Sequence, residues 1–169
     1  MNKKRMFSWI NHNLEIKETK GKSKGVFAKR KINKGETLCI FGGYIVTLIE
    51  EKVDSGIQIH DDLVLTSLDH KEPTDYVNHS CNPNAGIKGQ IFLVSTREIK
   101  KGEEICFDYA MCLYSKTEKP DYVFDCVCGD KNCRKSITSN DWKIKDLQKR
   151  YKGYFQFFLQ EKINKIQYK

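Results

Sequence analysis

Between residues 14 and 109 the hydrophobic positions fall in short runs, separated by glycine, asparagine and aspartate. The runs have the length and the β-branched or aromatic content of strands. No helix of more than about three turns fits between them, so we do not expect a fold that alternates strands with helices. Glu36 and Glu103 each follow a Lys-Gly step, which predicts a tight turn before a strand. The expected strands are 25–28, 37–41, 44–47, 63–66, 91–94 and 104–107.

Hydrophobic positions change to a helical spacing after residue 139. Ser139 or Asn140 can cap a helix there, with Asp141 in its first turn, while Gly153 weakens it. We expect one amphipathic helix over residues 138–169 that packs its apolar stripe on the domain, in preference to a helix that binds a partner or dimerises. The stripe is formed by Leu147, Tyr151, Tyr154, Phe155, Phe158, Leu159, Ile163 and Ile166.

The composition fits one compact domain, because the chain has 169 residues, of which 39% are hydrophobic. The net charge of +8 comes from basic ends, residues 1–35 and 141–169, around an acidic centre. Basic ends suit nucleic acid or an acidic partner, and an acidic centre suits a basic peptide. No apolar run approaches the roughly 20 residues of a membrane span. No secretory signal opens the chain, so we expect an intracellular protein.

Seven cysteines cannot all pair in disulfides, and clustered thiols in a reducing compartment more often bind metal. A loop predicted over residues 110–125 leads into Cys126, Cys128 and Cys133. Their spacing lets three thiolates converge on zinc, and Gly129 permits a tight turn between them. Buried free thiols are the alternative, which explains the cysteines in apolar strands better than it explains this cluster. Zinc takes four ligands, and the candidates for the fourth are Cys39, Cys81, Cys106, Cys112 and the four histidines.

Residues 78–84, with the sequence Asn-His-Ser-Cys-Asn-Pro-Asn, predict a polar loop. Three roles are open from the residues alone. His79 can act as a base, His79 and Cys81 can ligate a metal, or Asn78 and His79 can bind a polar ligand. Catalysis by a Cys-His-Asn set, as in thiol proteases, is a rival reading without an identifiable oxyanion site.

The chain resembles the SET-domain family of protein-lysine methyltransferases, which often carry a post-SET zinc motif. The resemblance spans roughly residues 13–137 and follows the family's motif order. Residues 78–84 are similar to its Asn-His-Ser-Cys signature, and residues 102–109 resemble its Gly-Glu-Glu-Leu-x-Phe-Asp-Tyr segment. The Cys-x-Cys-Gly-x3-Cys-Arg run at residues 126–134 looks like the post-SET element. Weaker matches are residues 23–28 and 41–45, and the chain departs from the usual residues at Ser23, Tyr44 and Asp75.

The resemblance implies a mainly β fold of the α+β class, built from small curved sheets. In this fold the segments around residues 78–84 and 102–109 thread through one another in a pseudoknot. It implies that Cys81 is the fourth zinc ligand, beside Cys126, Cys128 and Cys133. The expected divisions are a basic N-terminal extension (1–12), the SET domain (13–114), a post-SET zinc segment (115–137) and the C-terminal helix (138–169).

The resemblance also implies an enzyme that moves a methyl group from S-adenosylmethionine to a lysine amine. Tyr109 matches the catalytic tyrosine that orients the amine, and a phenylalanine at 107 favours di- or trimethylation. The cofactor-binding residues by this match are Lys24, Gly25, Val26, Asn78, His79 and Ile137, with Ile137 packed on the adenine. The lysine channel is expected from Tyr76, Phe107, Tyr122 and Phe124.

The implied partner is a lysine-containing protein, such as a histone or another basic protein, and we expect a monomer away from membranes. The compartment would be the cytoplasm of a bacterium, or otherwise the nucleus or a host cell. Two other functions are weighed against this one. A catalytically inactive SET module could bind peptide or act as a scaffold, although Asn78, His79 and Tyr109 are all retained. A small zinc protein could bind nucleic acid through its basic ends, but no base-reading motif supports it.

Overall fold

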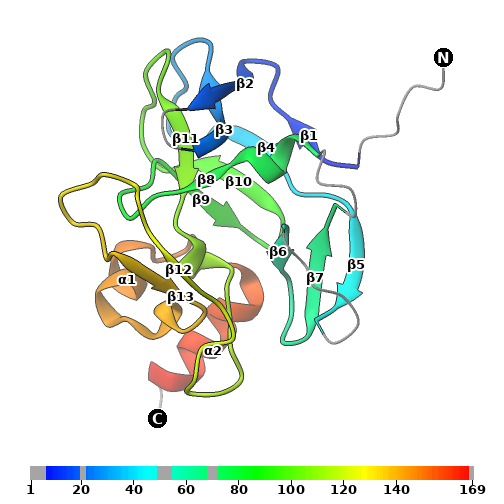
Figure 1. Cartoon of the computed structure of the whole chain (residues 1–169), viewed down its shortest axis with the longest axis vertical. Coiled ribbons are helices and arrows are strands. Elements are labelled where there is room, and N and C mark those ends of the chain that lie inside the picture. The colour runs from blue at the N-terminus through cyan, green and yellow to red at the C-terminus, as the bar shows by residue number, and fades with distance from the viewer. Residues whose placement is uncertain (1–6, 20–21, 49–54, 68–71, 168–169) are drawn as a thin grey trace.

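Most of the regular secondary structure consists of short strands, and none of those described exceeds seven residues. The computed structural model describes residues 7–19, 22–48, 55–67 and 72–167 (Figure 1). The strands are β1 (Trp9–Ile10), β2 (Leu14–Thr19), β3 (Lys22–Ala28), β4 (Thr37–Ile40), β5 (Tyr44–Thr47), β6 (Ile57–Gln58), β7 (Leu63–Thr66), β8 (Asn78–His79), β9 (Ala85–Lys88), β10 (Phe92–Ser95), β11 (Glu104–Phe107), β12 (Val123–Asp125) and β13 (Ser136–Thr138). The helices are α1 (Lys145–Arg150) and α2 (Phe157–Gln167), with 3₁₀ turns η1 (Pro73–Tyr76), η2 (Tyr109–Met111) and η3 (Asp141–Lys143).

The strands form several small sheets, in the orders β1-β4-β10-β9, β2-β3-β11-β8, β5-β7-β6 and β12-β13. Their pairings are antiparallel except for that of β8 with β11. That parallel pairing sets Asn78 against Cys106 and His79 against Phe107. It therefore brings together two segments that are far apart in the sequence, which the predicted pseudoknot requires.

Every strand expected from the hydrophobic pattern has a counterpart, as β3, β4, β5, β7, β10 and β11. The turns expected before Glu36 and Glu103 are confirmed, because Gly35 and Gly102 have φ angles of +87° and +82°. The loop expected over residues 110–125 was only partly correct, since it contains the end of η2 and all of β12.

The main core joins the sheets to the C-terminal segment. Ile105 and Phe107 of β11 are buried in the same cluster as Leu147, Phe158 and Leu159. Burial of each such side chain stabilises the fold by about 1.5–3 kcal/mol. The apolar stripe therefore packs on the domain as the helical spacing predicted, except for Ile166, which is 55% exposed. In Figure 1, α1 and α2 lie at the opposite end of the molecule from β1, β2 and β3.

The single helix expected over residues 138–169 is wrong. This segment contains the end of β13, then η3, α1 and α2, and residues 168–169 lie outside the described part. Gly153 has a φ angle of +79°, which a continuing helix cannot include. The backbone around it bonds elsewhere instead, with Ile87 N–H donating to the carbonyl of Tyr154 at 3.1 Å. In the described ranges, no helix is long and apolar enough to cross a membrane.

Candidate active site and metal centre

A cavity of about 550 Å³ opens beside the ends of β8 and β11. Val77, Phe107 and Tyr109 contribute to its wall from those two segments. The lining is mostly apolar and aromatic, which suits the alkyl chain of a bound ligand. Other lining residues include Phe41, Tyr114 and Tyr122 among the aromatic ones, and Gln58, Asp75, Asp121 and Ser139 among the polar ones.

Tyr109 lies where β11 ends and η2 begins. Its hydroxyl donates to the carbonyl of Val77 at 3.2 Å, and its backbone N–H donates to Nδ1 of His79 at 3.2 Å. Its ring also contacts Phe107, with ring centres 5.0 Å apart. Burial raises the pKa of Tyr109 well above its usual value, so the phenol stays protonated at neutral pH. The tyrosine is thus held at both its backbone and its hydroxyl.

The residues expected in a lysine channel are only partly brought together. Phe107 and Tyr122 line the cavity with Tyr109. Phe124 lies behind them, with its ring centre 5.8 Å from that of Tyr109 and 5.7 Å from that of Tyr122. Tyr76 is not among the lining residues, and its ring instead faces the amine of Lys24 at 5.6 Å.

The side chain of Asn78 on β8 forms a hydrogen bond with the backbone of β3. Its Nδ2 donates to the Lys24 carbonyl at 2.8 Å and to Glu104 Oε1 at 2.6 Å. Gly25 packs closely between them: a Cβ there would lie 2.5 Å from Glu104 Oε1 and 3.0 Å from Asn78 Nδ2, so a larger residue would have to displace these side chains. The absence of a side chain lets the Asn78 amide and the Glu104 carboxylate approach the backbone of β3 closely. The neighbouring Val26 is fully buried, so its side chain belongs to the core.

His79 and Ile137 lie on the side of the site toward the cysteines. Nε2 of His79 is 3.4 Å from Cys81 Sγ, while its Nδ1 accepts from Tyr109. Asp108 Oδ1 is 3.7 Å from Nδ1, which is too long for a hydrogen bond. Ile137 is fully buried in a small cluster with Cys81 and Cys126.

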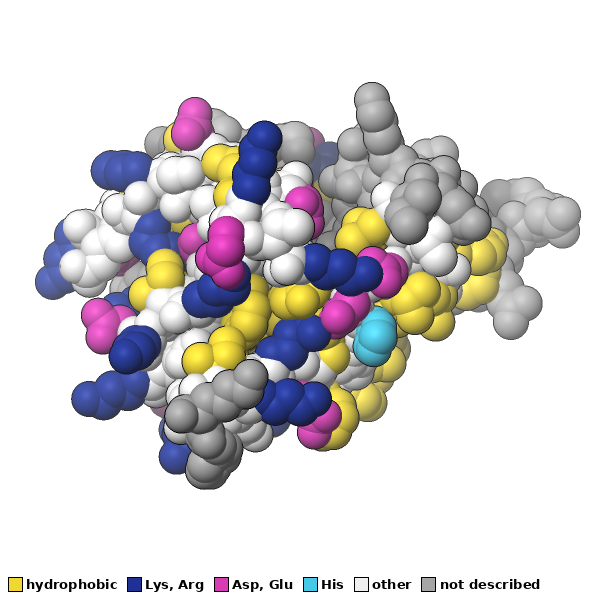
Figure 2. All heavy atoms as spheres, turned by 90° about the horizontal axis from the view of Figure 1, so that it is seen from below, with side chains coloured by type: hydrophobic (Ala, Val, Ile, Leu, Met, Phe, Trp, Pro, Cys, Tyr) yellow, Lys and Arg dark blue, Asp and Glu magenta, His cyan; other side chains and the backbone are white. Residues whose placement is uncertain are grey.

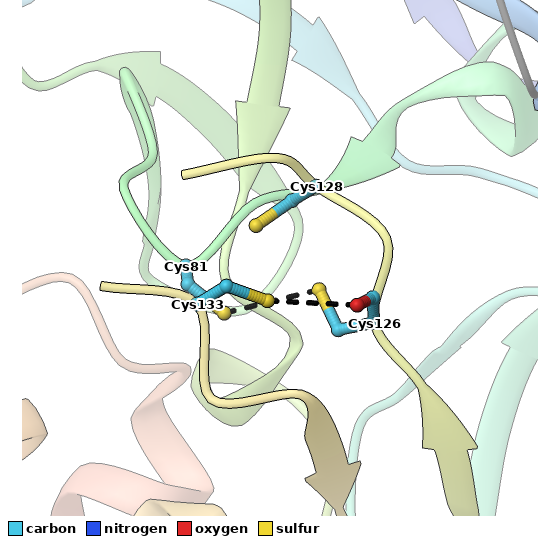
Figure 3. A group of neighbouring side chains, drawn as sticks. All are labelled: Cys81, Cys126, Cys128 and Cys133. Atoms are coloured by element: carbon cyan, nitrogen blue, oxygen red, sulfur yellow. Dashed lines mark hydrogen bonds between the residues drawn. The ribbon is translucent and has the colours of Figure 1, made fainter. Parts of the chain in front are cut away.

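The four cysteines expected to bind zinc converge (Figure 3). The Sγ atoms of Cys81, Cys126, Cys128 and Cys133 all lie within 4.8 Å of one another. A tetrahedral zinc with bonds of about 2.3 Å separates its sulfur ligands by about 3.8 Å, and the Cys81 and Cys126 sulfurs are 3.9 Å apart. The donor set and its spacing therefore fit one zinc ion. Gly129, with a φ angle of +76°, provides the expected turn.

The thiols of this cluster differ in acidity. Burial raises the pKa of Cys81 above its usual range and that of Cys126 to about 11. Burial also acts on Cys128, but backbone hydrogen bonds from Cys81 and Asp130 outweigh it and lower the pKa to about 7. A zinc ion binds thiolates, so its uptake would displace protons from these sulfurs.

Arg134 forms a buried ion pair that the sequence did not reveal. Its Nη1 and Nη2 donate to the two oxygens of Asp108 at 2.5 and 2.8 Å, and its Nε donates to Asp141 at 3.0 Å. Asp108 is completely buried and also accepts from the Ala110 N–H at 3.0 Å. Burial acts to lower the pKa of Arg134, but the bonds to Asp108 and the charges of both aspartates outweigh it and raise the pKa.

Two positions that depart from the family pattern have local roles. Asp75 accepts hydrogen bonds from Ser67 Oγ and from the Glu72 N–H, the latter at 3.2 Å, and so closes the start of η1. The Tyr44 ring is half exposed and packs against Phe7, with ring centres 5.0 Å apart. The side chain of Ser23 lies outside the described part of the chain.

Comparison with known proteins agrees with this fold and motif set. The SET domain model matches residues 23–110, which is more than half of the chain. The chain belongs to the SET domain family. It is 28% identical over 154 residues to histone-lysine N-methyltransferase mes-4 of Caenorhabditis elegans, covering 73% of this chain and 16% of that protein. It is 30% identical over 143 residues to a variant-silencing SET domain-containing protein of Plasmodium falciparum, covering 71% of this chain and 5% of that protein.

A solved structure supports the fold. The crystal structure of KRYPTONITE in complex with mCHH DNA, an H3(1-15) peptide and SAH aligns with a TM-score of 0.63 and 21% identity. The alignment covers 75% of this chain and 30% of that one. The mainly β fold of small sheets is therefore that of the SET domain, and the chain spans a small part of these longer relatives.

Proposed function

We propose that this chain transfers a methyl group from S-adenosylmethionine to the side-chain amine of lysine in a protein. The observation that carries the proposal is the setting of Tyr109. Its hydroxyl is fixed at the wall of an apolar cavity, and its backbone is bonded to the segment that contains Asn78 and His79. Relatives named as histone-lysine methyltransferases support the same reaction.

The proposed cofactor residues are not among those that line the cavity. Lys24, Gly25 and Val26 would contact the cofactor mainly through their backbone, beside the side chain of Asn78. The close packing at Gly25 supports a contact through the backbone, because an added Cβ would lie 3.0 Å from Asn78 Nδ2. Ile137 would pack on the adenine. The KRYPTONITE structure contains SAH, the product left when this methyl donor has reacted. When bound, S-adenosylmethionine supplies an electrophilic methyl group on a sulfonium.

The residues of the cavity would prepare the lysine. Free lysine has a pKa of about 10.4, so it is almost entirely charged at neutral pH. Apolar walls that include Phe107 favour the neutral amine, because burial penalises the charged form. The Tyr109 hydroxyl already donates to Val77, so its oxygen remains an acceptor for an amine N–H. Alignment of the amine with the methyl group would supply most of the rate enhancement.

The cysteine cluster would hold one zinc ion with a structural role. Three of its ligands come from the 126–133 segment and the fourth, Cys81, directly follows the proposed cofactor residues. Zinc with four protein ligands has no open position for substrate. The metal would therefore fix the C-terminal loop against the active-site segment.

For the substrate we propose a basic protein, with histones as the first candidates to test. Asp75 and Asp121 on the cavity lining would favour cationic side chains near the target lysine. The proposed site of action is then the nucleus. Nucleic-acid binding is less favoured for the C-terminal end, since Asp and Glu side chains are interspersed among the Lys and Arg on the face shown in Figure 2. Residues 1–6 lie outside the described part.

The test is transfer of labelled methyl from S-adenosylmethionine to mixed histones and other basic proteins. Tyr109→Phe should lower kcat by about 100-fold or more, as loss of one oriented polar group at a reacting centre does. Tyr44→Phe, which removes a hydroxyl from an exposed ring, should leave the rate unchanged. Absence of transfer to any lysine by the wild-type protein would refute the proposal and favour an inactive, peptide-binding SET module.

A further inference from the structure

Tyr151 contacts two parts of the proposed active site through one hydroxyl group. The residue follows α1, and only 5% of its surface is exposed. Its hydroxyl lies 3.1 Å from Asp108 Oδ2 and 3.3 Å from the carbonyl oxygen of Cys81. These partners are 43 and 70 residues away in the sequence. A phenol keeps its proton at neutral pH, so the hydroxyl is the donor, and its single proton is shared between these two acceptors.

Both acceptors adjoin residues with a proposed role in the reaction. Asp108 directly precedes Tyr109, and its backbone carbonyl and carboxylate begin η2, the turn from which Tyr109 projects. Cys81 lies three residues after Asn78 and two after His79, and it is a proposed zinc ligand. The Cys81 carbonyl also accepts from Arg150 Nη1 at 3.3 Å. The end of α1 thus contacts both the segment that leads into Tyr109 and the segment that contains Asn78, His79 and Cys81.

The hydroxyl is presented from a well-anchored element. The Tyr151 N–H donates to the Leu147 carbonyl at 2.8 Å, and Leu147 is buried in the main core. The ring packs near Phe155, with ring centres 6.3 Å apart. Residues after 110 lie outside the matched SET segment, so this support comes from the C-terminal part of this chain.

We propose that Tyr151 is a positioning residue for methyl transfer, whose hydroxyl holds the Asp108 carboxylate and the Cys81 carbonyl and so keeps Tyr109 aligned. The inference rests on the proposed function. Asp108 has further donors in Arg134 and Ala110, so it stays bound without Tyr151 but loses the contact that fixes it against Cys81. Small displacements of an aligning group strongly reduce the rate of a transfer that depends on orientation.

The experiment compares Tyr151→Phe with Tyr154→Phe, a matched loss of a hydroxyl three residues later. Tyr154 is half-buried, and its ring lies against Lys88 rather than against the active site. Tyr151→Phe should lower kcat about tenfold with little change in the KM for the peptide, because a hydrogen bond to a charged group is lost. Tyr154→Phe should match the wild type. Zinc content and melting temperature are measured on every variant.

A second set of measurements distinguishes an effect on the position of Tyr109 from destabilisation of the whole fold. In a double-mutant cycle, Asp108→Asn should remove most of the effect of Tyr151→Phe, because the hydroxyl acts through that carboxylate. Amide hydrogen exchange of residues 106–110 should also rise in Tyr151→Phe, whether or not substrate is present. Equal kcat values for Tyr151→Phe and an active wild type would overturn the inference and leave the proposed function standing. An inactive wild type would overturn both.

Discussion

Replacing Arg134 with methionine should destabilise the protein by about 3 kcal/mol, whereas the same change at Arg97 should cost less than about 1 kcal/mol. Both arginines form an ion pair with a shortest N–O distance of 2.5 Å, to Asp108 and to Glu103 respectively. The pairs differ in burial. The side chains of Arg134 and Asp108 are 16% and 0% exposed, against 51% and 27% for Arg97 and Glu103.

Burial sets the expected magnitudes. Removing one partner of a buried pair leaves an uncompensated charge and typically costs about 3–5 kcal/mol. The lower end applies here, because Asp108 keeps its bonds to Ala110 and Tyr151. An exposed pair contributes about 0–1 kcal/mol, since water replaces the lost partner. A loss of about 3 kcal/mol is a large part of the roughly 5–15 kcal/mol that stabilises a typical domain.

The assay is urea unfolding of zinc-loaded protein at a fixed free zinc concentration. It is repeated at about 0.1 and about 1 M salt, where the Debye length falls from about 10 to about 3 Å. The cost of Arg134→Met should persist at high salt, and the cost of Arg97→Met should vanish. Similar costs for the two variants would refute the reasoning from burial, as would a cost at Arg134 that disappears with salt.

Three further predictions concern the metal, the cofactor and pH. Cys81→Ser should lower zinc content below about one ion per chain, measured by mass spectrometry, whereas Cys39→Ser, a buried cysteine on β4, should not. Gly25→Ala should weaken binding of S-adenosylmethionine in calorimetry by about tenfold. Its Cβ would lie 2.5 Å from Glu104 Oε1 and would displace the Asn78 side chain bonded to it. Unchanged affinity would show that this part of β3 is not in the cofactor site. Burial raises the folded-state pKa of Tyr109 above its usual value of 10.0, so its contribution to stability is present below that pH and is lost as pH rises further. Melting temperatures should therefore fall more steeply above about pH 10 in the wild type than in Tyr109→Phe.

The hydrophobic pattern predicted the longer strands because each has one face against the core. It did not predict β8 or β9. Asn78 and His79 are polar, and their two-residue strand exists only because β11 pairs with it. Gly86 in β9 lowers strand propensity, yet its lack of a side chain is needed there, since a Cβ would lie 2.8 Å from the Tyr154 ring. Tertiary contacts of this kind are invisible to a local pattern.

The C-terminal segment illustrates the same limit. Its apolar spacing predicted most of the residues that face the core, but not the exposure of Ile166 or the break in the helix. The break at Gly153 allows Tyr154 to bond to Ile87 of β9 and Gln156 to bond to Met111. Those bonds join the segment to the sheet and to η2. A single straight helix would satisfy local spacing and lose both connections.

The proposed site was predicted by family motifs, while the residues that support it were not. Arg134 and Tyr151 meet Asp108 from separate segments, and no spacing in the sequence relates the three. A buried carboxylate needs donors. The sequence places Asp108 between an apolar strand and Tyr109, but several arginines and lysines are equally eligible as its cationic partner.

His79 joins the proposed metal centre to the proposed catalytic residue through a fixed tautomer. A neutral imidazole has one donor nitrogen and one acceptor nitrogen. Because Nδ1 accepts from the Tyr109 N–H, the proton belongs on Nε2, which then points at Cys81 Sγ from 3.4 Å. Both ring nitrogens are thereby engaged, so a contact from His79 to the cofactor must use its backbone or its ring face. A thiolate on zinc is a better acceptor for that Nε2–H than a neutral thiol. Metal binding would therefore strengthen the hydrogen bond from Nε2 to Cys81 Sγ, which orients the ring against Tyr109. The zinc could then influence the active site through His79 without contacting the substrate.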